Sequence, residues 1–170
     1  FEQYEGDTLL LRGPYGNGFD LEIYKNKELV IVAGGTGVSP VRGVIDHFAR
    51  NPQTAKSVTV IAGFKSPHDI LFRRDLKLWE ENLNLILTVD SREGDESYRE
   101  GLVTAYIPDL EFRNMEDACA IVVGPPAMMR FSTMALMDRG LKEEQIWISQ
   151  ERKMCCGLGK CGHCKINDVY

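Results

Sequence analysis

Four of the five cysteines crowd into one short stretch of the chain: Cys155, Cys156, Cys161 and Cys164. Clustered thiolates are ligands for zinc or for iron–sulfur clusters, and in a reducing compartment they indicate metal chemistry more readily than disulfides. Four residues separate Cys156 from Cys161, and two separate Cys161 from Cys164. Three glycines in the same stretch allow tight turns that direct backbone N–H groups at cluster sulfur. We therefore predict a metal centre held by Cys156, Cys161 and Cys164.

Two versions of this centre remain open. An iron–sulfur cluster bound by three of the thiolates leaves one ligand position to be filled, and Cys155, directly beside Cys156, is poorly placed to ligate the same iron pair. A zinc ion bound by all four cysteines is the alternative. The histidines are scattered, so we predict structural roles for His47 and His68 and loop packing or hydrogen bonding, not ligation, for His163.

A glycine-rich turn is the second candidate site. The apolar run from Leu29 to Ala33 leads into it, and Ser39 can cap the helix that follows. Glycines let backbone N–H groups approach an anion closely, and a helix N-terminus adds a partial positive charge. A phosphate or pyrophosphate therefore suits this turn, while a turn that binds no ligand is the alternative. The residues predicted to line the site are Gly34, Gly35, Thr36, Gly37 and Pro40.

A second loop is expected at the same edge of the molecule. Gly124 and Pro125 follow the apolar run from Ala120 to Val123, and a helix is expected from Ala127. Open parallel sheets bind ligands beyond the carboxyl ends of their strands. The two loops should therefore meet in one cleft.

Two common nucleotide-binding signatures are disfavoured. Pro40 stands at the third glycine position of the dinucleotide fingerprint, and the second strand ends in residues 62–65, Ala-Gly-Phe-Lys, without a carboxylate for a ribose diol. No Lys-Ser or Lys-Thr pair follows the glycine turn. These departures argue against a standard Rossmann dehydrogenase and against a P-loop nucleotidase.

Short apolar runs alternate with amphipathic stretches along the chain, which predicts an α/β fold with an open parallel sheet and helices on both faces. Thr8 to Arg12 reads as a further strand before a turn-rich segment, and the acidic stretch from Arg92 to Glu100 as a solvated loop. The expected strands are residues 29–33, 58–62, 85–89, 120–123 and 146–148, and the expected helices are residues 40–50, 73–81 and 127–139. We expect core positions for Trp79 and Trp147, and for most members of the set Met128, Met129, Phe131, Met134 and Met137.

Composition limits the function classes. The chain has 170 residues, 44% of them hydrophobic, which suits one compact domain with appendages. A net charge of −5 argues against binding to nucleic acid or to an anionic membrane. Neither a spanning segment nor a secretory signal is visible, so we predict a cytoplasmic protein without membrane insertion. No acid–base dyad or nucleophile–base pair is recognisable.

Taken together and in order, these motifs resemble those of the ferredoxin-NADP reductase superfamily, whose nucleotide domain carries a Gly-Gly-Thr-Gly-x-x-Pro loop. Residues 13–19 resemble the end of its flavin-binding barrel, residues 63–72 its second-strand loop, and residues 123–129 its Cys-Gly-Pro-x-x-Met motif, which brings Met128 into the predicted site. The resemblance implies a remnant of an N-terminal flavin barrel and its linker in residues 1–26, an NAD(P)-binding domain in residues 27–150 and a truncated iron–sulfur segment in residues 151–170. We therefore expect a fragment of a longer protein.

Within the superfamily, residues 151–164 are similar to the ending of the anaerobic sulfite reductase component that carries FAD and a 2Fe-2S cluster, and nearly as similar to that of the gamma subunit of sulfhydrogenases. The electron-transfer subunit of dihydroorotate dehydrogenase is more distant. The resemblance implies an NAD(P)H-dependent flavoprotein reductase subunit that passes electrons through FAD and a 2Fe-2S cluster to the catalytic and ferredoxin-like subunits of a heteromeric reductase. It also implies a fourth cluster cysteine a short distance beyond Tyr170.

The resemblance assigns further roles. Thr36 would lie at the junction of flavin and nicotinamide, and Ser91 and Arg92 follow the third strand where relatives that prefer NADP contact the 2'-phosphate. The neighbouring carboxylates of Asp90, Glu93, Asp95 and Glu96 oppose a dianionic phosphate, so NADH is the expected nucleotide, and an ordinary surface role for Arg92 remains open. Val123 stands where much of the family has cysteine, so no thiol is available beside the nicotinamide. A non-enzymatic, zinc-stabilised binding module is the alternative function.

Overall fold

The computed structural model describes residues 6, 8, 10, 13–15, 18–150 and 155–166. The chain divides into two compact units. The larger one is Asp20–Gln150, and the other combines Phe1–Phe19 with Glu151–Tyr170. The strand predicted from Thr8 to Arg12 and much of the turn-rich segment after it lie outside the described residues.

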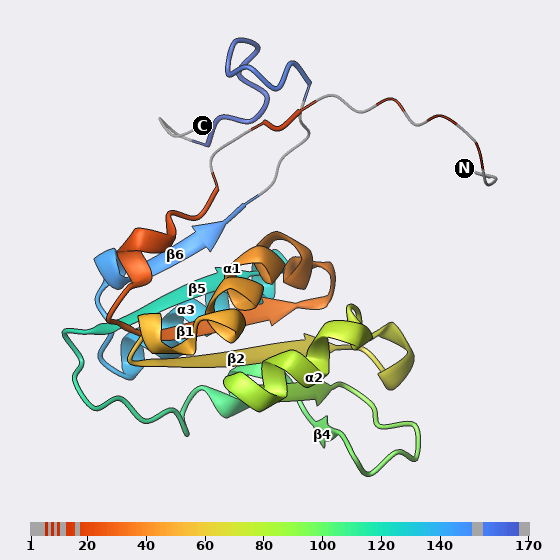
Figure 1. Cartoon of the computed structure of the whole chain (residues 1–170), viewed down its shortest axis with the longest axis vertical. Helices are drawn as coiled ribbons and strands as arrows, with labels where there is room; N and C mark the ends of the chain where they lie inside the picture. The colour runs from red at the N-terminus through yellow and green to blue at the C-terminus, as the bar shows by residue number, and fades with distance from the viewer. Residues whose placement is uncertain are drawn as a thin grey trace. The chain divides into compact units, whose positions relative to one another are not determined.

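The larger unit is built on one six-stranded sheet in which every described pairing is parallel (Figure 1). The strand order is β4-β3-β2-β1-β5-β6, so the chain moves outward from β1 in one direction and then returns to its other side. The strands are β1 Glu28–Gly34, β2 Ser57–Phe64, β3 Asn84–Val89, β4 Arg99–Glu100, β5 Ala118–Val123 and β6 Ile146–Ser149. This confirms the predicted open parallel α/β sheet.

Helices cover both faces of this sheet, because the crossovers on the two sides of β1 run in opposite directions. Figure 1 shows α1, Val38–Arg50, and α2, Arg73–Asn82, on the near face and α3, Pro126–Asp138, behind the sheet. The short 3-10 helices are η1 Leu21–Tyr24, η2 Gly35–Gly37, η3 Pro52–Thr54, η4 Pro67–Asp69, η5 Val103–Tyr106 and η6 Glu143–Gln145.

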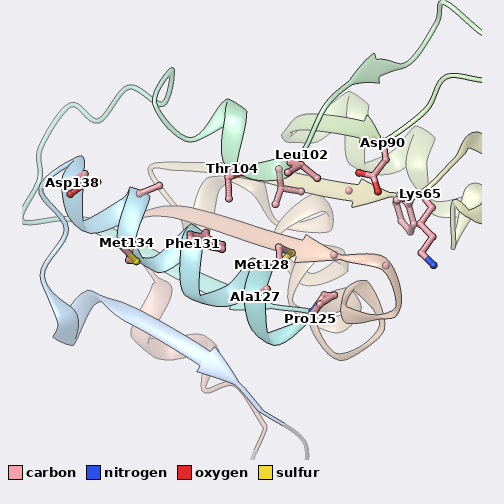
Figure 2. A pocket seen from close by; sticks show the side chains of 16 residues that line it. Lys65, Asp90, Leu102, Thr104, Pro125, Ala127, Met128, Phe131, Met134 and Asp138 are labelled. Carbon is pink, nitrogen blue, oxygen red and sulfur yellow. The ribbon is translucent and has the colours of Figure 1, made fainter.

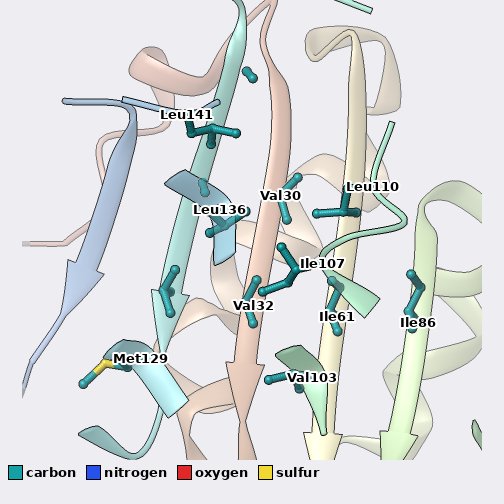
Figure 3. Packing of buried hydrophobic residues seen from close by; sticks show 13 residues of the cluster. Val30, Val32, Ile61, Ile86, Val103, Ile107, Leu110, Met129, Leu136 and Leu141 are labelled. Atoms are coloured by element: carbon teal, nitrogen blue, oxygen red, sulfur yellow. The ribbon is translucent and has the colours of Figure 1, made fainter. Parts of the chain in front are cut away.

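The core beneath α3 follows from the strand period of two. Val30 and Val32 of β1 and Ile61 of β2 point to the same side of the sheet, where they pack with Leu136 of α3 and Ile107 after η5 (Figure 3). The residues between them alternate to the other face, where α1 packs. This double burial explains why every residue of β1 is buried.

Polar contacts join α1 to α2. The indole N–H of Trp79 donates to Asp46 Oδ1 at 2.7 Å, and Arg42 Nε donates to Asp75 Oδ2 at 2.8 Å. Trp79 is almost fully buried, as predicted, while Trp147 is half-buried with the ring of Tyr24 against it, edge to face, at 5.3 Å between centroids. Two polar contacts therefore connect α1 to α2.

Most predicted boundaries hold within two residues, with two corrections. Helix α1 begins at Val38, and its N-cap is Gly37 without a side-chain hydrogen bond, so Ser39 lies inside the helix and does not cap it. The 3-10 turn Gly35–Gly37 leads directly into the helix. The N-cap position therefore falls on Gly37, which has no side chain to form a capping hydrogen bond. The stretch predicted as a solvated loop contains β4, because Val89 at the end of β3 pairs with Glu100.

A buried carboxylate at the start of β1 supports the loop before β5. Glu28 is 4% exposed, and its two oxygens accept the backbone N–H groups of Arg113 and Asn114, each at 2.9 Å.

Glu28→Ala should lower the free energy of unfolding by about 2–4 kcal/mol, because two donors lose their partner. Urea unfolding checks this. The exposed Glu111→Ala is the control and should change stability by less than about 0.5 kcal/mol; equal losses for both variants would contradict the role of Glu28.

Candidate functional site

The glycine turn and the loop after β5 meet, as the sequence predicts. A side-chain carbon placed on Gly37 would lie 2.5 Å from the carbonyl oxygen of Val123 and 2.9 Å from Gly124 Cα. Gly37 is also buried, so its lack of a side chain allows two loops to touch. Gly35 differs, because its φ is +55° and a side-chain carbon there would point into open space.

A cleft of about 780 Å³ opens beside this junction (Figure 2). Its volume lies within the range of small-molecule and cofactor sites. The walls come from the glycine turn, the ends of β2 and β3, the segment of η5 and one side of α3. The lining residues are Gly34, Gly35, Gly63, Phe64, Lys65, Asp90, Leu102, Val103, Thr104, Pro125, Ala127, Met128, Phe131, Met134, Ala135 and Asp138.

The predicted site residues divide between the wall of the cleft and its surroundings. Gly34, Gly35, Pro125 and Met128 line the cleft. Thr36 and Pro40 are exposed beside the glycine turn, while Gly37 and Gly124 form the contact between the two loops. Ser91 and Arg92 do not belong to the cleft wall either. The sequence motifs thus identify the residues at one end of the cleft but not those along the rest of its wall.

The ends of β2 and β3 contribute two charged residues, Lys65 and Asp90, that were not among the predicted site residues. Lys65 and Asp90 are exposed and line one end of the cleft (Figure 2). The backbone N–H of Asp90 donates to the carbonyl of Phe64 at 2.9 Å, and that of Ser91 donates to the carbonyl of Lys65 at 3.1 Å. These bonds place the loop after β3 beside the end of β2. Lys65 and Asp90 each follow a strand of the parallel sheet directly, and this position was the sequence signal that could have identified them as cleft residues.

Arg92 is engaged by carboxylates of its own loop and of β4. Its Nη1 lies 2.6 Å from Glu96 Oε2, and its Nε lies 3.5 Å from Glu100 Oε2. The side chain is 34% exposed. One guanidinium beside two carboxylates leaves a net negative charge at this place, which does not favour a further anion.

Helix α3 presents two different faces, which corrects the prediction for its methionines. Met129 packs in the core, but Phe131, Met134 and Met137 are 57%, 49% and 40% exposed. Positions three or four residues apart share a helix face, so one side of α3 meets the sheet while Phe131 and Met134 line the cleft. The prediction of a helix is confirmed. The prediction that most of this set packs in the core is wrong, because Phe131, Met134 and Met137 are exposed.

The cysteine segment belongs to the smaller unit. Gly157, Gly159 and Gly162 have φ values of +68°, +71° and +75°, so the backbone turns sharply between the cysteines. The N–H of Leu158 donates to Cys156 Sγ at 3.3 Å. Hydrogen bonds from the backbone of His163 and of Cys156 lower the pKa of the Cys161 thiol, whereas desolvation and then the neighbouring thiols raise the pKa of Cys155.

These features suit thiolate ligands. Backbone N–H groups directed at sulfur stabilise the charged form, and the spacing Cys-x4-Cys-x2-Cys is that of plant-type 2Fe-2S proteins. Among the described residues, however, no three His, Cys, Asp or Glu side chains form a group that could hold a metal ion. The remaining cysteine, Cys119, is buried in β5, and burial raises its pKa to about 12, which makes it a poor nucleophile.

The histidines outside the cysteine segment have no metal partners in the part of the chain that is described. His47 is half-buried with its ring edge to face with Phe48, at 5.1 Å between centroids. His68 is exposed, and its Nε2 lies 3.8 Å from a carboxylate oxygen of Glu93, so it has no role in the core. None of the described helices is long and apolar enough to cross a membrane.

An open parallel sheet with a ligand-sized cleft at the point where strand order reverses is typical of nucleotide-binding α/β domains. Residues 31–133, more than half of the chain, match the family described as the oxidoreductase NAD-binding domain, and the chain belongs to this family. This supports the ferredoxin-NADP reductase-like class that the sequence motifs indicate.

Similar proteins share most of the chain. It is 36% identical over 174 residues to sulfhydrogenase 2 subunit gamma of Pyrococcus furiosus, covering 94% of this chain and 60% of that protein. It is 30% identical over 165 residues to the electron transfer subunit of dihydroorotate dehydrogenase B (NAD(+)) of Streptococcus mutans, covering 95% and 57%. The chain therefore spans about 60% of the length of these relatives.

Among solved structures, the NADH-dependent reduced ferredoxin-NADP oxidoreductase, described in connection with flavin-based electron bifurcation, matches with a TM-score of 0.65 and 25% identity. The match covers 95% of this chain and 52% of that one. The predicted ferredoxin-reductase-type fold is thus confirmed.

The two glycines of the turn should respond differently to a methyl group. Gly37→Ala places the methyl against the backbone of Val123 and should cost about 2–3 kcal/mol of stability. Gly35→Ala meets no neighbouring atom and should cost about 1 kcal/mol, from its left-handed backbone alone. Urea unfolding of both variants measures the difference. A loss for Gly35→Ala as large as that for Gly37→Ala would contradict the loop contact.

Proposed function

We propose that this chain is the nicotinamide-nucleotide-oxidising part of an electron-transfer subunit. Electrons pass from NAD(P)H through FAD and a 2Fe-2S cluster to a partner subunit of a heteromeric reductase. The observation that carries the proposal is the cleft at the carboxyl ends of β1, β2 and β3, in a chain of the NAD-binding oxidoreductase family. The names of the relatives, which are electron-transfer and gamma subunits, support the same role.

The nucleotide's phosphates are assigned to the glycine turn. Gly34 and Gly35 line the cleft, and Gly35 carries no side chain that would separate its backbone from a ligand. Helix α1 begins at Val38, directly after the turn, and its N-terminus adds positive potential. Thr36, exposed in the turn, is assigned to the junction of nicotinamide and flavin.

The apolar wall of the cleft suits a nucleotide base. Leu102 and Phe131 are 64% and 57% exposed, although large apolar side chains normally pack in the core. Both line the cleft together with Met134, and Figure 2 shows Phe131 and Met134 on α3. We assign the base of the nucleotide to this wall, which would remove these side chains from water.

Electron flow needs a carrier that converts a hydride into single electrons, and a bound flavin supplies that chemistry. This chain contributes placement of the nucleotide, and Val123 before Gly124 leaves no thiol to take part. Cys156, Cys161 and Cys164 are assigned as three ligands of the 2Fe-2S cluster. Their spacing and the N–H···S bond of Leu158 support this assignment.

Two partners are considered for the electrons. The ending of the chain favours a sulfite-reducing partner of the anaerobic type, as predicted from residues 151–164. The 36% identity to a sulfhydrogenase gamma subunit favours a hydrogenase partner as the second candidate. Affinity purification of the tagged protein with its native partners, followed by assays of NAD(P)H-dependent sulfite reduction and hydrogen evolution, distinguishes them. Activity with neither acceptor would contradict both assignments.

The apolar wall provides a direct test of nucleotide binding. Phe131→Ser should weaken nucleotide binding about tenfold, because a buried aromatic contact worth about 1.4 kcal/mol is lost. Met137→Ser is the matched control, since Met137 is 40% exposed on the same helix but does not line the cleft. Isothermal titration of the purified chain with NADH and NADPH measures both. Equal affinities for the two variants and the wild type would place the base elsewhere.

Analysis of the metal bound by the cysteine segment distinguishes an iron–sulfur cluster from a zinc ion. The full-length protein, purified anaerobically, should contain iron and acid-labile sulfide and give an EPR signal on reduction. Cys161→Ser should lose the cluster, whereas Cys155→Ser should keep it because Cys155 is not an assigned ligand. Zinc without labile sulfide, bound more weakly in both variants, would instead support the zinc-stabilised module.

A further inference from the structure

We infer that Tyr15 is a positioning residue for the cysteine segment: the face of its ring packs on Gly157, fixes the turn that follows Cys156 and keeps water from that side of the metal centre. The inference rests on the proposed 2Fe-2S site and adds to it a residue from the other end of the chain, outside the cysteine motif. Tyr15 and Gly157 both belong to the smaller unit.

The contact joins a ring face to a backbone carbon. A side-chain carbon placed on Gly157 would lie 2.9 Å from Cγ of Tyr15 and 3.0 Å from both Cδ1 and Cδ2. A point almost equally distant from these three atoms lies over the face of the ring, because no position beside the ring edge satisfies all three distances. The ring therefore occupies the place of a side chain at Gly157, and any residue other than glycine would displace it.

Two separate constraints apply to Gly157, and a second glycine of the segment has only one of them. Gly157 has a left-handed φ of +68°, which is costly for residues with a side chain, and it also meets the ring. Gly162 has a similar φ of +75°, but a side-chain carbon placed there would meet no atom within 4 Å. The two glycines therefore separate the effect of backbone conformation from that of ring packing.

Burial along the cysteine segment agrees with the position of the ring. Within residues 155–163, every residue is exposed except Cys156 and Gly157, which are half-buried, and Tyr15 is half-buried as well. Gly157 directly follows Cys156, and the next N–H group, that of Leu158, donates to Cys156 Sγ at 3.3 Å. The ring thus packs on the turn whose backbone directs this donor at the sulfur.

A ring packed on such a turn affects a metal centre in two ways. It limits the motion of the turn, so the thiolate and its N–H···S bond stay in place, and outer contacts of this kind change metal affinity by about 10- to 100-fold. It also excludes water. A less hydrated 2Fe-2S cluster has a lower reduction potential, because reduction adds a negative charge that water would stabilise.

The test uses the full-length protein, purified anaerobically. Tyr15→Ala should lose iron to a chelator about tenfold faster than wild type, and its midpoint potential, followed by EPR, should shift to more positive values. Tyr15→Phe keeps the ring face and should retain the wild-type rate and potential. An unchanged rate and potential in Tyr15→Ala would overturn the inference, and faster loss at an unchanged potential would overturn the exclusion of water by the ring.

The two glycines supply the matched control. Gly157→Ala should release iron about tenfold faster than Gly162→Ala, because both variants strain a left-handed backbone and only the first displaces the ring. In a Tyr15→Ala background the two alanine variants should behave alike, since the ring is gone. Equal rates for the two single variants would contradict the ring contact.

A measurement without the cluster separates this inference from the proposed function. In metal-free protein with isotope-labelled glycine, the ring face should move an Hα resonance of Gly157 upfield of those of Gly162, and Tyr15→Ala should remove the shift. Absence of the shift in wild type would overturn the Tyr15 contact while leaving NADH binding and the cluster in place. A wild-type protein that shows the shift but binds no iron would overturn the proposed cluster instead.

Discussion

Strand β1 pairs in parallel with β2 on one side and with β5 on the other, and every feature of the larger unit depends on this double pairing. Gly34 at the end of β1 is opposite Gly63 in β2, and Ala33 is opposite Val123 in β5. The three strands therefore end at the same level, and their following loops meet. Helix α1, which follows β1, and helix α3, which follows β5, lie on opposite faces of the sheet. No crossover helix therefore covers the edge at which these loops come together.

Close approach of backbone segments is the condition for this arrangement. Gly37 meets the carbonyl of Val123 where any side chain would be in the way, and the loops after β2 and β3 are joined by two backbone hydrogen bonds. A floor of main-chain atoms results at this edge of the sheet. Such a floor suits a ligand that is recognised through phosphates and ribose hydroxyls, since backbone groups need no side-chain ordering on binding.

Helix α3 shows how one element serves both stability and binding. Leu136 and Met129 are buried under the sheet, while Phe131 and Met134 remain in the cleft wall. The same cleft is lined by the charged residues Lys65 and Asp90, which lie at one end of it. An apolar wall ending in a polar rim matches the two halves of a nucleoside, a flat base and a hydroxylated sugar.

Much of the fold followed from the sequence alone. Apolar runs such as Leu29 to Ala33 and Val58 to Ala62, separated by helical stretches, were sufficient for the parallel sheet, because strands buried on both faces require continuous apolar residues. The glycine turn and Gly124-Pro125 were placed correctly at the same edge for the same reason. The cysteine spacing likewise predicts a metal centre, and that prediction rests on the sequence.

What only the tertiary structure decided is which residues face the cleft. Sequence periodicity identifies the faces of α3 but not which of them meets the sheet. Most of the set that includes Phe131 and Met134 was therefore expected in the core, whereas these two side chains line the cleft. Asp90 and Arg92 stand close in the sequence, yet hydrogen bonds to β2 place the first in the cleft, and Glu96 and Glu100 engage the second. Local sequence specifies strands and turns through short-range backbone preferences. The orientation of a charged side chain depends on partners that folding alone brings within reach.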